Sequence, residues 1–315
     1  MRRRHAAVTG ARQPRPVSLR LVVPLLAVAV AGVGVMLYPS AARWVTAIQE
    51  SDQVQQYTEQ VSQIPPPKRD KEIRAAQAYN AELAGGAISG AFSSRPTGTG
   101  GIADHQRYES LLSPSPGAPM ARLQIPSINV DLPIYHGTSD HTLDHGIGHI
   151  EGTALPVGGP GTHAVLTGHR GLPQSVLFTN LNKVKVGDRF DIEVYGETLN
   201  YTVVTVTVVD PDQTETLYPV PGRDLVTLVT CTPLGINSQR ILVTGQRLLD
   251  ATTAHPLGKP TMRAGFPWWA VWFGLAVMAA TAYTAGIARG NRRLRASPLV
   301  SADEPPATAT DPLSG

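Results

Sequence analysis

The sequence has little cysteine: one residue, Cys231, among 315. A single cysteine cannot form a disulfide within the chain, so a disulfide-stapled scaffold is excluded. In an oxidising compartment cysteines are usually paired or absent. If the domain that carries it is exported, Cys231 is an intermolecular link, an inert core residue or a working thiol.

The central part of the chain lacks an excess of positive charge. The net charge is +3, but residues 39–263 hold 17 Lys and Arg against 21 Asp and Glu. The basic excess lies at the two ends, in residues 1–20 and 289–295. A nucleic-acid-binding protein carries its basic residues on the folded domain. This distribution therefore argues against a nucleic-acid partner.

Two segments lack charged residues altogether. Leu21–Tyr38 has 18 uncharged residues, and Ala264–Ala288 has 25 with several tryptophans at its start. About 20 apolar residues span a bilayer, and arginines beside a span stay in the cytoplasm. The pattern predicts a protein of the cell membrane with two spans, both termini cytoplasmic and the middle outside. A cleaved signal peptide ending near Ser40 remains an alternative for the first span, although its apolar run is long for one.

No internal repeat is evident, and the segments between the spans change in character. Residues 39–63 and 68–83 have helical composition and are separated by three prolines, and a third short helix is expected over Asp104–Leu112. Gly85–Gly101 is rich in Gly, Ser and Pro and reads as a surface loop. The sequence predicts this order of segments: a basic leader 1–20, a span 21–38, a helical stalk and lid 39–119, a β domain 120–250, a linker 251–263, a span 264–288 and a polar, disordered tail 289–315.

From Ala121 onward the period changes to that of strands. Short runs rich in Val, Ile, Thr and Leu are bounded by Pro, Gly, Asn and Asp. Seven runs in about 130 residues, with few helical patterns among them, predict an all-β barrel or sandwich. The runs are Ala121–Ile125, Ile128–Ile134, His163–His169, Arg189–Val194, Thr198–Val209, Leu225–Cys231 and Ile241–Leu249.

The lone thiol lies at the end of one of these strands. Cys231 closes an apolar run just before a Pro/Gly turn, and Arg240 opens the next strand nine residues later. A hairpin of that length can bring the two side by side. Far upstream, His169 ends another strand beside a glycine turn. A nucleophilic thiol needs a proton carrier such as histidine and a donor for the developing oxyanion, which a guanidinium provides.

These residues resemble the motifs of a family, the sortases, and within it the pilin-polymerising class C. The TLxTC motif is Thr227–Cys231, the downstream arginine is Arg240, and the upstream histidine is His169 within HAVLTGHRGLP. The resemblance extends through IPSINVDLPIYHGT, GHIEGTALPVGG and TCTPLGIN and covers residues 120–250. Two flanking spans are also similar to that class.

The resemblance implies an eight-stranded β-barrel and a two-step transpeptidation. Cys231 attacks the carbonyl between Thr and Gly of an LPxTG-like sorting signal, His169 carries the proton, and Arg240 stabilises the oxyanion or holds the substrate. Thr230 and Thr227 are implied as supporting groups. The partners are surface proteins or pilins that carry sorting signals, and the acceptor is a pilin lysine. We expect a monomer that needs no cofactor.

The resemblance also implies a lid before the barrel, with an Asp-Pro-aromatic motif whose aspartate meets the arginine. The matching place here reads Gly90-Ala91-Phe92, with no aspartate before Phe92. We interpret Phe92 as the lid aromatic and expect a lid without an ionic latch to Arg240.

The histidines raise a separate hypothesis, a metal site. His136, His141, His145, His149 and His163 cluster within 28 residues. His141 and His145 have the spacing of one helical face, but their surroundings do not predict a helix, and no His-Glu-x-x-His pattern occurs. No metal is therefore expected.

Rival readings remain for the chemistry. Free cysteines are often inert core residues, and arginines are often exposed ion-pair partners. The alternatives to pilus assembly are a wall-anchoring sortase that uses a peptidoglycan precursor amine and a non-catalytic scaffold module on a membrane anchor.

Overall fold

The computed structural model describes residues 18–83, 102–248 and 264–296. The chain divides into two compact units. One comprises residues 1–38 and 268–315, and the other comprises residues 39–267. The predicted leader, linker and tail, the Gly85–Gly101 loop and Phe92 lie largely or wholly outside the described residues.

The first unit consists of apolar helix. It contains the start of α1 (Leu19–Gln63) and all of α5 (Trp268–Ala296). Within the described residues these two helices are long and apolar enough to cross a membrane, with mean hydropathy of 2.4 and 1.5 over their most apolar windows. Gly34 lies against Phe273, since a Cβ on Gly34 would be 3.4 Å from the phenylalanine ring. Two helices with the length and composition of spans are thus present, as the uncharged segments predict.

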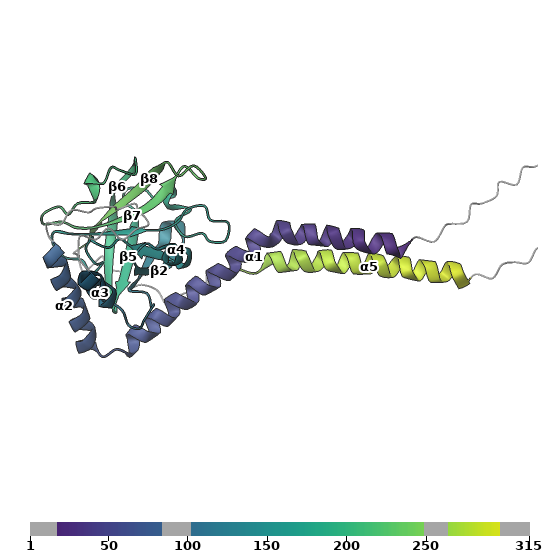
Figure 1. Cartoon of the computed structure of the whole chain (residues 1–315), viewed down its shortest axis with the longest axis horizontal. Helices are drawn as coiled ribbons and strands as arrows, with labels where there is room; N and C mark the ends of the chain where they lie inside the picture. The colour runs from purple at the N-terminus through teal and green to yellow at the C-terminus, as the bar shows by residue number, and fades with distance from the viewer. Residues whose placement is uncertain (1–17, 84–101, 249–263, 297–315) are drawn as a thin grey trace, which may run out of the picture. The chain divides into compact units, whose positions relative to one another are not determined.

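The second unit is built on a closed eight-stranded barrel (Figure 1), which confirms the predicted fold class. The strands follow the order β1-β2-β3-β4-β7-β8-β6-β5, and β5 pairs back with β1. Two neighbouring pairs, β2/β3 and β4/β7, are parallel, and the others are antiparallel. The strands are β1 (Ala121–Ile125), β2 (Val130–His136), β3 (Ile147–His149), β4 (Thr162–Thr167), β5 (Arg189–Val194), β6 (Glu197–Val209), β7 (Asp224–Thr232) and β8 (Gln239–Arg247).

The sequence pattern does not show β3, which is absent from the seven predicted runs. Three residues are too few for an alternating pattern to appear. One of them is Gly148, where a Cβ would be 2.4 Å from the carbonyl oxygen of Gly137. The backbones of β2 and β3 therefore approach too closely for any larger residue.

Three helices of the second unit pack on the barrel (Figure 1). In the later part of α1, the buried Tyr57 hydroxyl donates to the Met120 carbonyl and accepts from the Tyr195 amide, both at 3.0 Å. Asn80 of α2 (Pro66–Leu83) makes two hydrogen bonds to the Leu155 backbone. Tyr108 of α3 (Ile102–Ser110) is buried and bonds to His149. Buried side chains of α2 and α3 belong to the same hydrophobic core as the barrel interior, and α1 contributes the buried Val54, Tyr57 and Val61.

A short helix, α4 (Asp140–His145), lies where the sequence analysis expected none. The expectation was wrong because hydrogen bonds at the two ends of the helix stabilise a segment whose residues have weak helical propensity. The Ser139 hydroxyl accepts from the Thr142 amide at 3.1 Å, and the Gly146 amide donates back to the Thr142 carbonyl. Such an N-cap stabilises a helix by about 1 kcal/mol. On this helix the rings of His141 and His145 stack on each other, with their centroids 4.6 Å apart.

A buried ion network ties β1 to β2 and β5. Arg122, with a side chain only 1% exposed, donates to Asp131 at 2.7 Å and to Glu193 at 3.1 Å. Buried charges of this kind are tolerated only when they are paired. The Arg122 guanidinium therefore links β1 to both of its neighbours in the barrel.

We predict that Arg122→Ala destabilises the protein by about 3–5 kcal/mol, because it leaves two carboxylates buried without their counter-charge. Urea unfolding of the full chain in detergent, followed by the β-sheet circular dichroism signal, measures this loss. The control is Arg107→Ala, which removes the exposed pair with Glu82 and should hardly move the midpoint. Equal shifts for the two variants would contradict the prediction.

Candidate active site

The hairpin of β7 and β8 brings Cys231 and Arg240 together. The two residues are direct partners in the antiparallel register. Directly opposite residues have Cβ atoms about 4.5–5.5 Å apart. Both are partly buried, and the Arg240 guanidinium donates to the carbonyls of Asn237 and Gln239 at 2.9 and 3.0 Å. The turn thus fixes the guanidinium at the strand end that carries the thiol.

On the other side of β7, the parallel strand β4 leads to His169. Thr167, its last residue, is the partner of Val229. Extending this register by two residues places His169 alongside Cys231. Beyond the strand, the Gly168 amide still donates to the Val229 carbonyl at 3.1 Å. The fold therefore aligns positions 169, 231 and 240 across three adjacent chain segments.

Two threonines that flank the cysteine contact the residues on either side of His169, one through the backbone of Gly168 and one through the side chain of Arg170. The Thr230 hydroxyl, which is buried, donates to the Gly168 carbonyl at 2.7 Å. The Thr232 hydroxyl accepts from Arg170 at 2.8 Å. Residues 168 and 170 are thus tied to residues 230 and 232. The family resemblance implies a supporting role for Thr230, but it assigns no role to Arg170 or Thr232.

Gly168 lies close to two side chains. A Cβ there would be 2.7 Å from Ile147 Cδ1 and 3.0 Å from the Phe178 ring. A larger residue at this position would therefore require these side chains to move.

The thiol lies on the outer face of the barrel. Val226 and Leu228 of β7 belong to the interior core, whereas Val229 belongs to a separate small cluster. That cluster also contains Leu217 of the 3₁₀ turn η3 (Glu215–Leu217) and Leu242 of β8. Because side chains alternate along a strand, Cys231 shares the face of Val229. The thiol therefore adjoins an apolar surface outside the core.

Thr227, the second proposed supporting residue, lies on that same face, four residues before Cys231. Its hydroxyl contacts His163 Nε2 at 2.7 Å and the Thr244 hydroxyl at 2.8 Å. His163 Nδ1 contacts the Tyr218 carbonyl at 3.1 Å, and burial lowers the pKa of this histidine. Thr227 thus belongs to a buried polar chain that joins β4, β7 and β8.

The other clustered histidines contact backbone and hydroxyl groups. His149 is fully buried between the Tyr108 hydroxyl at 2.9 Å and the Ala154 carbonyl at 2.8 Å. His136 contacts the Leu111 carbonyl at 2.8 Å. Within the ranges that the structure describes, no three His, Cys, Asp or Glu side chains are grouped so that they would hold a metal ion.

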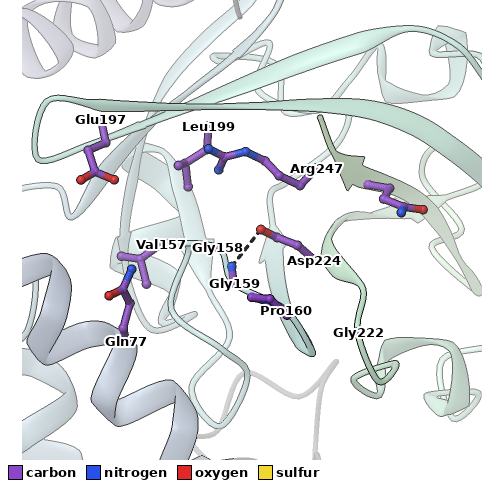
Figure 2. A pocket seen from close by; sticks show the side chains of 11 residues that line it. Gln77, Val157, Gly158, Gly159, Pro160, Glu197, Leu199, Gly222, Asp224 and Arg247 are labelled. Carbon is purple, nitrogen blue, oxygen red and sulfur yellow. Dashed lines mark hydrogen bonds between the residues drawn. The ribbon is translucent and has the colours of Figure 1, made fainter. Parts of the chain in front are cut away.

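A separate polar pocket lies at the opposite end of the β7/β8 hairpin (Figure 2). It encloses about 290 Å³ and is lined by Asp224 and Arg247, by Gln77 of α2 and by the Val157–Pro160 loop. Asp224 accepts from the Gly159 amide at 2.8 Å, and burial raises the pKa of its carboxyl. Seven residues of strand, about 23 Å, separate Asp224 from Cys231. This pocket therefore takes no part in chemistry at the sulfur.

The barrel and its strand-end thiol define a class of protein, the barrel-type cysteine transpeptidases, and comparisons with known proteins identify the family. A model of the sortase domain matches residues 123–248. Sortase C-1 from Actinomyces oris is 49% identical, with a TM-score of 0.53 over 57% of this chain and 98% of that chain. Sortase C1 from Streptococcus agalactiae is 38% identical, with a TM-score of 0.58 over 62% of this chain and 98% of that chain. Sortase D from Bacillus subtilis is 29% identical over 156 residues, which are 48% of this chain and 75% of that protein.

This chain belongs to the sortase family of cysteine transpeptidases. The similar solved structures include class C sortases, as the sequence motifs predict. The family assignment excludes the non-catalytic scaffold module.

The buried histidines should make the stability of the protein depend on pH. Burial lowers the pKa of His149 to about 4, whereas the unfolded value is about 6.5. Between pH 4 and pH 6.5 the folded state therefore binds fewer protons than the unfolded state. The contribution of the neutral histidine to the unfolding free energy is fully present above pH 6.5 and is lost as the pH falls towards 4. His149 alone contributes about 3 kcal/mol to this loss.

Unfolding of the full chain at a series of pH values tests this prediction. His149→Gln should reduce the slope of the unfolding free energy against pH. The expected reduction corresponds to roughly one bound proton, or about 1.4 kcal/mol per pH unit at the steepest point. The control is His141→Gln, an exposed histidine on α4, which should leave the slope unchanged. A His149→Gln slope equal to that of the wild type would refute the assignment.

Proposed function

We propose that this chain is a membrane-tethered sortase that cleaves an LPxTG-like sorting signal between threonine and glycine. It then transfers the threonine carbonyl to an amine, and the acceptor we propose is a pilin lysine, so that the product is an isopeptide-linked pilus. The observation that supports this most directly is the register of β7 with β8, which pairs Cys231 with Arg240, together with the β4/β7 pairing that leads the chain towards His169.

In the first step, Cys231 gives its proton to His169, and the thiolate sulfur attacks the threonine carbonyl carbon to form a tetrahedral oxyanion. The carbon–nitrogen bond to glycine then breaks, and the departing amine takes a proton from His169. The result is a thioester between Cys231 and the sorting signal. A covalent intermediate of this kind divides one difficult step into two easier ones.

In the second step, the acceptor amine attacks the thioester carbonyl. His169 accepts the proton that the amine loses, the carbon–sulfur bond breaks, and the Cys231 thiolate leaves. The new amide joins the two proteins, and no oxidant or cofactor is consumed. The same histidine thus donates a proton in one step and accepts one in the other.

Arg240 is the group that we propose stabilises the oxyanion or holds the substrate backbone. Its position directly opposite Cys231 supports this role, as do the carbonyls of Asn237 and Gln239 that hold its guanidinium. A donor fixed before the reaction is worth more than a mobile one, because it needs no reorganisation when charge develops.

The membrane arrangement is part of the proposal. Two apolar helices support two spans, and the arginines before residue 21 and after residue 288 support cytoplasmic termini. The central region has no basic excess, which supports an extracellular barrel. The boundaries we propose are those predicted from the sequence, with spans over 21–38 and 264–288 and the catalytic domain over 120–250. An extracellular barrel meets sorting signals on the surface where pili grow.

The pilin acceptor is favoured over a peptidoglycan amine by the solved relatives. One of them, 41% identical over 96% of its chain, is sortase C1 of GBS Pilus Island 1. In the sequence, α2 and α3 stand on either side of the segment interpreted as the lid, a feature that the resemblance to the pilus class implies.

We predict that Cys231→Ala abolishes cleavage of a fluorogenic LPxTG peptide by the full chain in detergent. Arg240→Ala should lower kcat about 100-fold or more, as expected for loss of an oxyanion donor. The matched control is Arg189→Ala, an exposed arginine at the start of β5, which should keep wild-type kcat. Cleavage that persists in Cys231→Ala would leave the mechanism without its nucleophile.

The acceptor is tested by competition. The full chain is mixed with an LPxTG peptide, a pilin domain and a short oligoglycine, and the products are identified by mass spectrometry. We expect the peptide to be joined to a pilin lysine side chain. A product formed only with the glycine amine would instead identify a wall-anchoring sortase.

A further inference from the structure

The loop that follows His169 is closed at its base. The Phe178 amide donates to the His169 carbonyl at 3.1 Å, and the Gly171 amide donates to the Thr179 hydroxyl at 3.0 Å. Arg170 Nε donates to the Thr179 carbonyl at 3.2 Å. Residues 169–171 are thus paired with residues 178–179, and any movement of the loop tip acts on the backbone of His169.

The tip of this loop is held by helix α1. Arg43 Nε donates to the Pro173 carbonyl at 2.8 Å, and the Ser175 hydroxyl donates to Glu50 at 2.7 Å. Ser175 is only 3% exposed, and burial raises the pKa of Glu50. Arg43 and Glu50 are seven residues apart, so they lie on one face of the helix, two turns from each other. The two side chains therefore hold the loop at both sides of its tip.

We propose that Glu50 and Ser175 are positioning residues for His169, and that α1 holds the histidine-bearing loop in the geometry required for proton transfer. This inference rests on the proposed function of His169. Neither residue touches the reacting atoms. They act through the loop backbone, which is also held by Thr230 at the Gly168 carbonyl and by Thr232 through the Arg170 side chain.

The expected effect is on the rate of the chemical step. Proton transfer requires its groups within hydrogen-bond reach, and a displacement of about 1 Å can slow a reaction about 100-fold. Because the Thr230 and Arg170 contacts remain, we expect Glu50→Ala and Ser175→Ala each to lower kcat about tenfold. KM for the sorting-signal peptide should remain within about twofold, since neither residue belongs to the outer face that carries Cys231.

The test measures kcat and KM of the full chain in detergent for five variants. Glu50→Gln should retain most of the activity of the wild type, because its amide oxygen still accepts from Ser175. The Glu50→Ala/Ser175→Ala double variant should be no slower than either single variant, as expected for one shared interaction. Ser175→Ala changes the loop alone, so the test remains decisive if Glu50→Ala folds poorly.

The matched control is Tyr57→Phe. It removes two hydrogen bonds between the same helix and the barrel but does not touch the loop. It should lower the melting temperature and leave kcat unchanged. Unchanged kcat in Glu50→Ala and Ser175→Ala, or an equal loss of kcat in Tyr57→Phe, would overturn the inference.

These outcomes are separate from a failure of the proposed function. If cleavage persists in Cys231→Ala, the proposed mechanism fails whatever Glu50 does. If cleavage depends on Cys231 but not on Glu50 or Ser175, only the positioning role is lost.

Discussion

The structure depends on the register of three neighbouring strands. The antiparallel pairing of β7 with β8 sets Arg240 opposite Cys231, and the parallel pairing of β4 with β7 ends two residues before His169 and Cys231. A shift of one residue in β7 would turn Cys231 into the barrel interior, because side chains alternate between the two faces of a strand. The closed barrel, with its interior filled by apolar side chains, prevents such a shift. The packing of the core thus also keeps Cys231 on the outer face, where it can react.

Polar groups near the strand ends support this register. Thr230 and Thr232 tie the chain around Cys231 to the chain around His169, and Thr227 joins His163 and Thr244 across β4, β7 and β8. Histidines that suggest a metal site in the sequence instead contact carbonyl and hydroxyl groups. Helix α1 adds further support, because it contacts the loop that begins at His169.

Much of the fold was predictable because the strands carry strong local patterns. Ala121–Ile125 and Arg189–Val194 are predicted to the residue, and the ends of the other five predicted strands differ by one or two residues. The failures have local causes. β3 is too short to show a period, and α4 depends on a serine cap that outweighs weak helical propensity. The pairing of Cys231 with Arg240 was accessible because a hairpin joins residues that are close in sequence.

The sequence by itself determined the lone thiol, the sortase motifs, the β architecture and the two apolar segments, since each is written in a local run of residues. Only the tertiary structure decided which side chains surround the segment that carries His169. Arg170 and Thr232 are 62 residues apart, and Ser175 and Glu50 are 125 apart. Such contacts leave no periodic signal in the chain, because they form only when barrel closure and helix packing bring distant segments together.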